Sequence, residues 1–306
     1  MDLRDSISGR KVCAWRLRTR SLELGRRTLV MGVVNITPDS FSDGGCLLDP
    51  EAAVAHGLQL LEEGADILDL GAESTRPGSK AGGDAPHVSA EEEQARLLPV
   101  LTGILKERPQ AVLSVDTYKA ATARAALAAG AEIVNDVSGF GWDRELPGVC
   151  AEVRCAVILM HTRGRPEEWR AQEMLDADAL VALVRSGLAS SLEAALSAGN
   201  APEAIVIDPG YGFGKRFGEN FSLLARQGEL LELGRPLLAG LSRKSFLGHA
   251  LKALYGGEPA PVDARETASI AALVSAILHG ASIVRVHNVR PAVESVRIAD
   301  SVLAAR

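Results

Sequence analysis

Acidic, amide and cationic side chains recur in this sequence at the ends of short apolar runs. The clearest of them are Asn35, Asp69, Asp116, Asn135, Asp208 and Arg285. Carboxylates and amides make hydrogen bonds of defined geometry, and an arginine offers a planar fork of N–H groups to an anion. Polar groups beside buried apolar residues are costly unless they are paired or bind a ligand. The pattern therefore predicts a polar ligand site built from several strand ends.

Eight runs rich in Val, Ile and Leu carry these residues, and Ala-, Leu- and Glu-rich stretches with helical periodicity separate them. The runs are residues 29–35, 66–70, 112–116, 132–135, 156–160, 204–208, 237–240 and 282–287. Such alternation is typical of parallel strands with crossover helices, and eight strands close a barrel. We predict an α/β fold, a single-domain (β/α)8 TIM barrel over residues 29–306, with an open doubly wound sheet as the competing layout. Residues 1–28 should form an N-terminal extension, a hairpin or plug on the barrel floor.

Composition argues against several classes of protein. The 306 residues carry a formal net charge of −6, and a nucleic-acid partner usually requires a basic face, so we expect none. The strongest membrane candidate, residues 268–284, contains His279 and Gly280 and is shorter than a bilayer requires. We interpret it as a buried helix that ends at Gly280, followed by a strand. The first residues lack the apolar core of a signal peptide, which favours a cytoplasmic protein with no membrane segment.

Local sequence signals indicate where the predicted helices begin, bend or end. Ser89, with Glu92 three residues later, is typical of a capping box, and Gly57, Gly130 and Gly280 fall where helices could end or bend. The four cysteines form no CxxC pair and have no zinc-ligand spacing, so we predict reduced thiols that serve mainly in packing. They are Cys13, Cys46, Cys150 and Cys155.

Seven segments of this sequence resemble the signatures of the dihydropteroate synthase family, in the order of that family and over nearly the whole chain from residue 29 onward. They are VNITPDSFSDGG, ESTRPGS, SVDT, IVNDVSG, DPGYGFGK, LSRKSFLG and RVHN. One segment alone would be weak: GYGFGK lacks the GxxxxGK spacing of a phosphate loop. The resemblance implies an enzyme that condenses 6-hydroxymethyl-7,8-dihydropterin pyrophosphate with p-aminobenzoate, giving 7,8-dihydropteroate and pyrophosphate in folate biosynthesis.

The resemblance also implies which residues bind the two rings. For the pterin they are Asp69, Asp116, Asn135, Met160, Asp208 and Lys244. For p-aminobenzoate they are Phe41, Thr75, Pro77, Phe213, Lys244 and Ser245. A carboxylate such as Asp208 suits the adjacent N–H donors of a pterin. A helix beginning after Lys244 would offer its N-terminus to the carboxylate of the second substrate.

Pyrophosphate is the leaving group, and its departure needs cations and hydrogen-bond donors. By resemblance the site for it comprises Asn35, Thr75, Arg76, Arg285 and His287. Mg²⁺ would bind the substrate phosphates, with Asn35 as its protein ligand. The residues assigned to catalysis are Lys244, Asp39, Asp43 and Arg76. We expect segments 37–45 and 74–83 to act as lids that order when substrates bind. Asp39 and Asp43, in the first of these segments, would shield a cationic intermediate.

Structural alternatives stay open for many of these residues. A strand-end aspartate can cap a helix or form a salt bridge, and Arg285 can form a salt bridge at the barrel end. Asp69 can support the pterin acids from behind, Phe213 can be a packed loop aromatic, and Met160 can be plain core. For Asp39 and Asp43 the alternative is solvated loop charge.

Two departures from the common family pattern and three rival functions remain. The segment MHTRGRPEEW replaces a Met-Gln-Gly sequence, and Asn288 follows His287 where Asp often stands. Neither touches a residue assigned to direct substrate contact. The two nearest rivals are a methyltetrahydrofolate-dependent methyltransferase and a non-catalytic pterin-binding paralogue, and a phosphate-binding barrel of unrelated chemistry comes third. The family resemblance also implies a homodimer and inhibition by sulfonamides.

Overall fold

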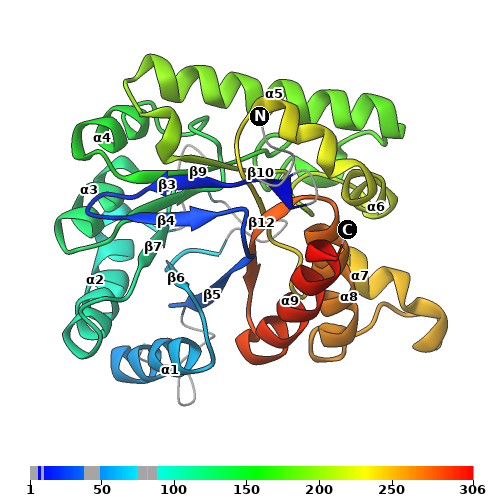
Figure 1. The fold of residues 1–306 in the computed structure, drawn as a ribbon, viewed down its shortest axis with the longest axis horizontal. Helices are drawn as coiled ribbons and strands as arrows, with labels where there is room; N and C mark the ends of the chain where they lie inside the picture. Colours follow the sequence, from blue (N-terminus) through cyan, green and yellow to red (C-terminus); the bar gives the residue numbers. More distant parts are fainter. Residues whose placement is uncertain (1–5, 8–9, 38–48, 75–80, 82–87, 306) are drawn as a thin grey trace.

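A closed barrel of eight parallel strands forms the centre of the protein (Figure 1). The computed structural model describes residues 6–7, 10–37, 49–74, 81 and 88–305. The barrel strands are β5 (Leu29–Asn35), β6 (Ile67–Gly71), β7 (Leu113–Asp116), β8 (Ile133–Asp136), β9 (Ala156–Met160), β10 (Ile205–Asp208), β11 (Leu237–Ala239) and β12 (Ala281–Val286). Each agrees with a predicted run to within one residue at either end. The predicted TIM barrel is confirmed and the open sheet is wrong, because β12 pairs with β5.

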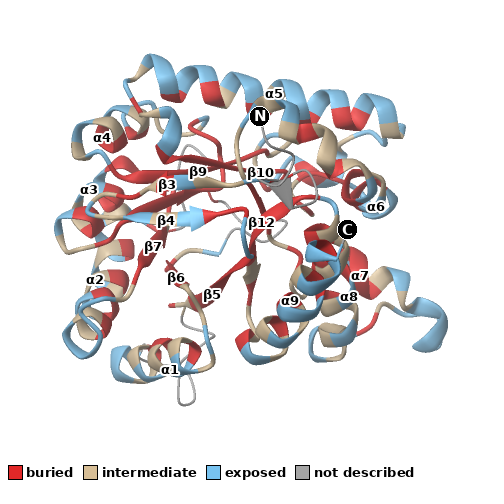
Figure 2. Cartoon of the chain, in the orientation of Figure 1, coloured by how far each residue is buried: buried red, intermediate tan, exposed pale blue. Residues whose placement is uncertain are grey.

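Helices surround the barrel and bury the faces turned toward it, while their outer faces are exposed (Figure 2). They are α1 (Pro50–Glu62), α2 (Ala90–Glu107), α3 (Ala120–Ala128), α4 (Leu146–Val153), α5 (Ala177–Ser197), α6 (Phe217–Arg226), α7 (Ser245–Ala250), α8 (Glu266–Leu278) and α9 (Val289–Ala304). Among the described helices, α5 alone is long and apolar enough to cross a bilayer by those two criteria. Its buried residues Val184, Leu188 and Leu192 recur every fourth position, which is typical of a helix packed on a core.

The predicted helix signals are mostly confirmed. The Ser89 hydroxyl accepts a 3.1 Å hydrogen bond from the Glu92 amide at the start of α2. Gly130 and Gly280 follow α3 and α8 with φ of 117° and 99°, so the apolar stretch 268–284 does divide into a helix and a strand. The prediction for Gly57 is wrong. It lies inside α1, where a Cβ would come 2.8 Å from Cδ1 of Ile104, so its missing side chain lets α1 and α2 approach closely.

An N-terminal hairpin closes the end of the barrel where the strands begin, as predicted for a plug. Two-residue strands β1 (Ser6–Ile7) and β2 (Arg10–Lys11) precede it, and the hairpin itself is β3 (Cys13–Arg16) with β4 (Ser21–Leu24). Trp15 and Leu24 pack with Met31, Ile67 and Ile283 in one buried apolar cluster. The Trp15 indole N–H also donates to the carbonyl of Ala204 at 2.9 Å. A domain boundary at residue 28 stays a prediction.

Three of the four cysteines lie in the described part of the chain and are free thiols, as predicted. They are Cys13, Cys150 and Cys155. Cys46 lies outside the described residues.

Candidate active site

Polar side chains form the outer layer of the barrel interior because inward positions alternate along each strand. Ile67 and Ile283 pack in the apolar floor cluster. Side chains two residues further along a strand point to the same face, and those residues are Asp69 and Arg285. The residues at or just after the ends of β7 to β11 complete what we call the mouth layer: Asp69, Asp116, Asn135, Met160, Asp208, Gly240 and Arg285.

Arg285 lies in a hydrogen-bonded network of the mouth layer and bonds two of its carboxylates. Its Nε donates to Oδ2 of Asp69 at 2.6 Å, and its Nη2 donates to Oδ2 of Asp116 at 2.7 Å. Nδ2 of Asn135 donates to the same Asp69 oxygen at 2.9 Å. Burial disfavours the Arg285 cation, but the two carboxylates outweigh burial and raise its pKa. The barrel-end salt bridge, which the sequence left open for Arg285, is therefore present, and its role toward pyrophosphate stays a prediction.

Two carboxylates of the mouth layer have raised pKa values. Burial raises the pKa of Asp116 to about 7; Arg285 opposes this shift and Asp69 adds to it. Burial also raises the pKa of Asp208, whose Oδ1 accepts a 2.7 Å hydrogen bond from the Gly210 amide. Acids with such shifts gather at functional sites, where a ligand supplies the missing partners.

Lys215 holds together the glycine-rich loop that follows β10. Its Nζ donates to the carbonyls of His161, Gly210 and Phe213 at 3.1, 2.8 and 3.3 Å. Burial lowers the pKa of Lys215 to about 7. Gly210 has φ of 70°, and a Cβ there would lie 2.0 Å from the His161 carbonyl oxygen, so only glycine fits. Lys215 thus satisfies its hydrogen bonds on loop backbone and leaves the Asp208 carboxylate to the mouth layer.

Lys244 and Phe213 meet at the edge of the mouth. The Lys244 ammonium lies 4.0 Å from the centroid of the Phe213 ring, a cation–π contact. Burial lowers the pKa of Lys244 to about 8, with Asp208 opposing the shift. Helix α7 begins directly after Lys244, at Ser245, as the sequence predicted. The structure therefore brings together three residues assigned to the second substrate.

The loops after β11 and β12 are joined by three hydrogen bonds. The His287 amide donates to Oγ of Ser242 at 3.3 Å, and Nδ1 of His287 lies 3.0 Å from the same oxygen. Nη2 of Arg243 donates to Oδ1 of Asn288 at 2.9 Å. Asn288 is one of the departures from the family pattern, and its amide oxygen still accepts a hydrogen bond. That departure therefore preserves a link between the two loops.

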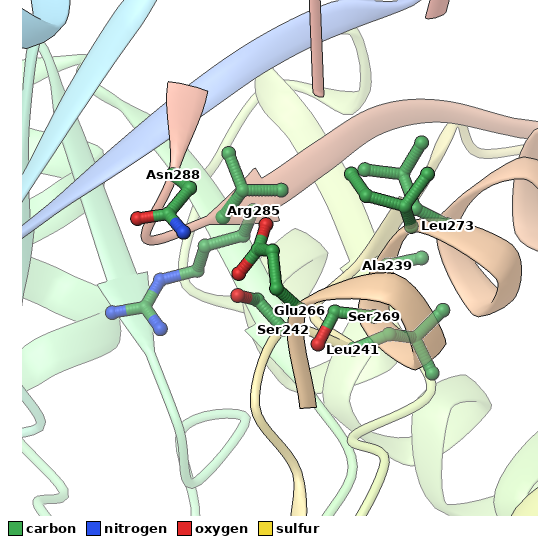
Figure 3. Close-up of a pocket in the computed structure, with 10 residues that line it drawn as sticks. Ala239, Leu241, Ser242, Glu266, Ser269, Leu273, Arg285 and Asn288 are labelled. Carbon is green, nitrogen blue, oxygen red and sulfur yellow. The ribbon is translucent and has the colours of Figure 1, made fainter. Parts of the chain in front are cut away.

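A small cavity lies behind Arg285 and does not contain the ligand site. Its volume is about 10 Å³. Figure 3 shows Arg285 and Asn288 on one side of it and Leu273 and Ala239 on the other. This volume is about that of one water-sized probe, so a bicyclic ring cannot enter. The mouth layer is the better candidate for the ligand site.

The remaining predicted site residues divide into two groups. Asn35 ends β5 and Met160 ends β9, where Met160 packs in a buried cluster with Tyr118, Val137 and Phe213. Outside the described residues lie Asp39, Phe41, Asp43, Thr75, Arg76 and Pro77. Roles of individual residues toward substrates therefore stay predictions.

Sequence reasoning missed two residues that support the site from behind. They are Lys215 and Trp169. The Trp169 ring packs edge-on against Phe213, with centroids 5.1 Å apart. An aromatic residue inside the departing segment MHTRGRPEEW was the only available signal for it.

Comparisons with known proteins identify the family of the chain. A family described as "Pterin binding enzyme" matches residues 31–287. Dihydropteroate synthase of Mycobacterium leprae is 44% identical over 269 residues, which are 88% of this chain and 91% of that protein. The structure of Xanthomonas albilineans dihydropteroate synthase with 4-aminobenzoic acid is 42% identical, with a TM-score of 0.83, and the match covers 96% of this chain and 99% of that one. A Yersinia pestis dihydropteroate synthase in a sulfonamide drug complex is 36% identical, with a TM-score of 0.84 and coverage of 96% and 100%.

The barrel and its carboxylate-rich mouth define a pterin-binding barrel enzyme, since the matched family covers most of the chain and all of the mouth layer. The chain is 44% and 42% identical to two dihydropteroate synthases over at least nine tenths of their length, which narrows the class to that enzyme family. The chain belongs to the dihydropteroate synthase family, transferases of folate biosynthesis.

Proposed function

We propose that this chain joins 6-hydroxymethyl-7,8-dihydropterin pyrophosphate to p-aminobenzoate through the residues of the mouth layer and Lys244. The observation that carries the proposal is the hydrogen-bonded set in which Arg285 and Asn135 meet on Asp69, with Asp116 on the other side of the guanidinium. Acceptors and donors from four strands thereby face one opening. A flat heterocycle with several polar edges matches such a ring of groups.

The pterin is proposed to lie over the mouth layer. Oδ1 of Asp208 is occupied by the Gly210 amide, which leaves Oδ2 as an acceptor for ring N–H groups. Asn135 and Asp116 contribute further polar contacts, and Met160 packs against the ring face. Gly240 presents no side chain, and even a Cβ there would lie 3.8 Å from Oδ2 of Asp208. The space beside that oxygen is what a ring requires.

The second substrate is proposed to lie beside Lys244, Phe213 and Ser245, with Phe41, Thr75 and Pro77 from the two lid segments. The Lys244 ammonium can interact with both the pterin carbonyl and the aromatic amine. Sulfonamides that imitate p-aminobenzoate are expected in the same place, as the drug complex of the Yersinia relative suggests.

The leaving pyrophosphate is proposed to bind Arg285, His287 and Asn35, together with Thr75 and Arg76. Among the described residues no group of three or more His, Cys, Asp or Glu could hold a metal. This fits a Mg²⁺ ion carried by phosphate oxygens and waters, with the Asn35 amide oxygen as its protein ligand. Held there, such an ion would supply positive charge beside the departing group.

The reaction breaks the bond between the pterin methylene carbon and the pyrophosphate oxygen and forms one to the amine nitrogen of p-aminobenzoate. That nitrogen then loses a proton. Carbon–oxygen cleavage is proposed to be well advanced before the new bond forms, because the pterin ring delocalises the positive charge. Asp39 and Asp43 are proposed to stabilise this cation and exclude water.

The chain is proposed to be a cytoplasmic homodimer. Exposed apolar residues on one side of the molecule support self-association: Phe217 and Phe221 on α6, and Leu254 shortly after α7. A second copy would bury them. Sedimentation of the wild type and of Leu254→Glu tests this, since the substitution should shift the protein toward the monomer.

One assay separates this function from its rivals. The purified protein, incubated with the pterin pyrophosphate, Mg²⁺ and p-aminobenzoate, should release pyrophosphate and form dihydropteroate in equal amounts. A binding paralogue would take up pterin without releasing pyrophosphate. A methyltransferase would instead demethylate methyltetrahydrofolate in the presence of a corrinoid acceptor.

A further inference from the structure

One aromatic residue of the loop after β9 contacts the site. This loop, residues 161–176, contains the departing segment MHTRGRPEEW except for its first residue, Met160, which ends β9. Trp169 begins a short 3₁₀ turn, Trp169–Ala171, and its ring meets that of Phe213 at an interplanar angle of 83° with centroids 5.1 Å apart. This is the edge-to-face arrangement that aromatic pairs prefer. The segment that departs from the family pattern therefore contacts Phe213, which is assigned to the p-aminobenzoate pocket.

Trp169 is held firmly in its own loop. It is 5% exposed, and its indole N–H lies 3.2 Å from both Oγ1 of Thr162 and the carbonyl of Gly164. Next to the indole nitrogen the chain comes very close: a Cβ on Gly214 would lie 3.0 Å from Cδ1 of Trp169 and 2.6 Å from Cβ of Arg163. The glycine after Phe213 thus allows the two loops to pack directly.

The backbone of Phe213 is held from the same side as its ring. Its carbonyl accepts hydrogen bonds from the Arg163 amide at 3.4 Å and from Nζ of Lys215 at 3.3 Å. The Arg163 side chain is 8% exposed and pairs with Glu219 of α6 at 3.2 Å. The loop after β9 therefore contacts both the backbone and the ring of Phe213.

The Phe213 ring also contacts the Lys244 ammonium, which lies 4.0 Å from the ring centroid. Phe213 therefore contacts both Trp169 and Lys244. We propose that Trp169 is a positioning residue: it fixes the Phe213 ring, and through that ring the Lys244 ammonium, and so sets the affinity for p-aminobenzoate and for sulfonamides. This inference rests on the proposed function, which assigns Phe213 and Lys244 to the second-substrate pocket.

Steady-state kinetics with both substrates tests the proposal. Trp169→Leu removes the ring edge but keeps an apolar side chain. It should raise KM for p-aminobenzoate about tenfold, the scale of one lost aromatic pair, and raise the sulfonamide inhibition constant in parallel. KM for the pterin pyrophosphate should change less than KM for p-aminobenzoate, because only Lys244 is shared by both pockets in this proposal, whereas Asp69, Asp116 and Asn135 lie on β6, β7 and β8. Trp169→Phe, which keeps an aromatic edge, should restore most of the wild-type value.

Two controls keep the result interpretable. Arg170→Ala changes the exposed neighbour of Trp169 in the same loop and should leave both KM values unchanged. Melting curves identify variants that are merely unstable, and Trp169→Met replaces the leucine variant if that protein does not fold. A merely structural role predicts that both KM values and the melting temperature change together, and that result would overturn the proposal. If a folded, active Trp169 variant binds p-aminobenzoate as tightly as the wild type, the positioning role is overturned and the proposed function is not. If the wild-type protein itself shows no turnover, both are overturned.

Discussion

Arg285 and Asp69, 216 residues apart in the sequence, are joined across the barrel mouth by a 2.6 Å ion pair. Asp69 is completely buried, and its second carboxylate oxygen, Oδ1, has no hydrogen-bond partner among the described residues. The charge of Asp69 therefore depends on Arg285, helped by the Asn135 amide. If Arg285 moves toward a pyrophosphate, the Asp69 carboxylate needs another hydrogen-bond partner. The polar edge of a pterin can be that partner.

Removing the guanidinium should affect rate and stability together. Arg285→Ala should lower the turnover rate by about a hundredfold or more, because an anion-stabilising donor is lost. It should also lower the melting temperature, because a buried carboxylate loses its counter-ion. Arg285→Lys is the matched control: it keeps the charge without the fork, so it should recover stability better than rate. Wild-type turnover in the alanine variant would contradict the anion-site assignment.

Filling the space at Gly240 should block the pterin without disturbing the fold. Its φ lies outside the left-handed region, and a Cβ would meet nothing closer than Oδ2 of Asp208 at 3.8 Å. Gly240→Val is therefore compatible with the backbone but places methyl groups in the mouth layer. We expect loss of measurable pterin binding by calorimetry with a melting temperature near that of the wild type. Gly240→Ala, the smaller control, should retain partial affinity. Full affinity in the valine variant would mean that the ring lies elsewhere.

Lys244 predicts the alkaline side of the pH profile. Its pKa is lowered to about 8 by burial, so its positive form declines as pH rises above that value. We expect kcat/KM to fall about tenfold per pH unit above pH ~8, and Lys244→Arg to remove the fall even where its overall rate is lower. The stability effect has the opposite sign. Since the folded-state pKa lies below the unfolded value of 10.5, this lysine destabilises the fold below pH ~8 and that cost disappears toward pH 10.5. A profile that stays flat to pH 10 would exclude Lys244 as a charged participant.

Much of the barrel could be predicted from the sequence because local signals set it. Each β-strand is a short run of branched apolar residues, and the helices between the runs are long enough for crossovers. Residues such as Asp69 and Arg285 stood out as polar groups at strand ends. Their partnership could not be foreseen, because it depends on the closure of the barrel, which sets the register between β12 and β5.

Contacts between separate helices and between separate loops also could not be predicted from the sequence. Gly57 looked like a helix end because glycine is a poor helix former, yet its missing side chain serves the packing of α1 on α2. Trp169 lies in a segment without periodicity, and its contact with Phe213 joins the loops after β9 and β10. No pattern within either loop indicates such a pairing.

The carboxylate of Asp208 provides the most direct test of where the pterin lies. Oδ1 accepts the Gly210 amide, so in Asp208→Asn the amide oxygen should keep that bond and the NH₂ group should take the place of Oδ2. A donor would then face the N–H donors of the pterin. Such a mismatch costs roughly 1–3 kcal/mol, or about ten- to a hundredfold in affinity.

Stability should respond differently to the same substitution. Burial raises the pKa of Asp208, so burial destabilises the ionised carboxylate relative to its neutral form. The neutral amide removes that cost, and the melting temperature should stay level or rise. Calorimetric titration with a pterin ligand, set beside a melting curve, distinguishes the two effects. Unchanged pterin affinity together with a lowered melting temperature would assign Asp208 to holding the loop after β10 and would refute this placement of the ring.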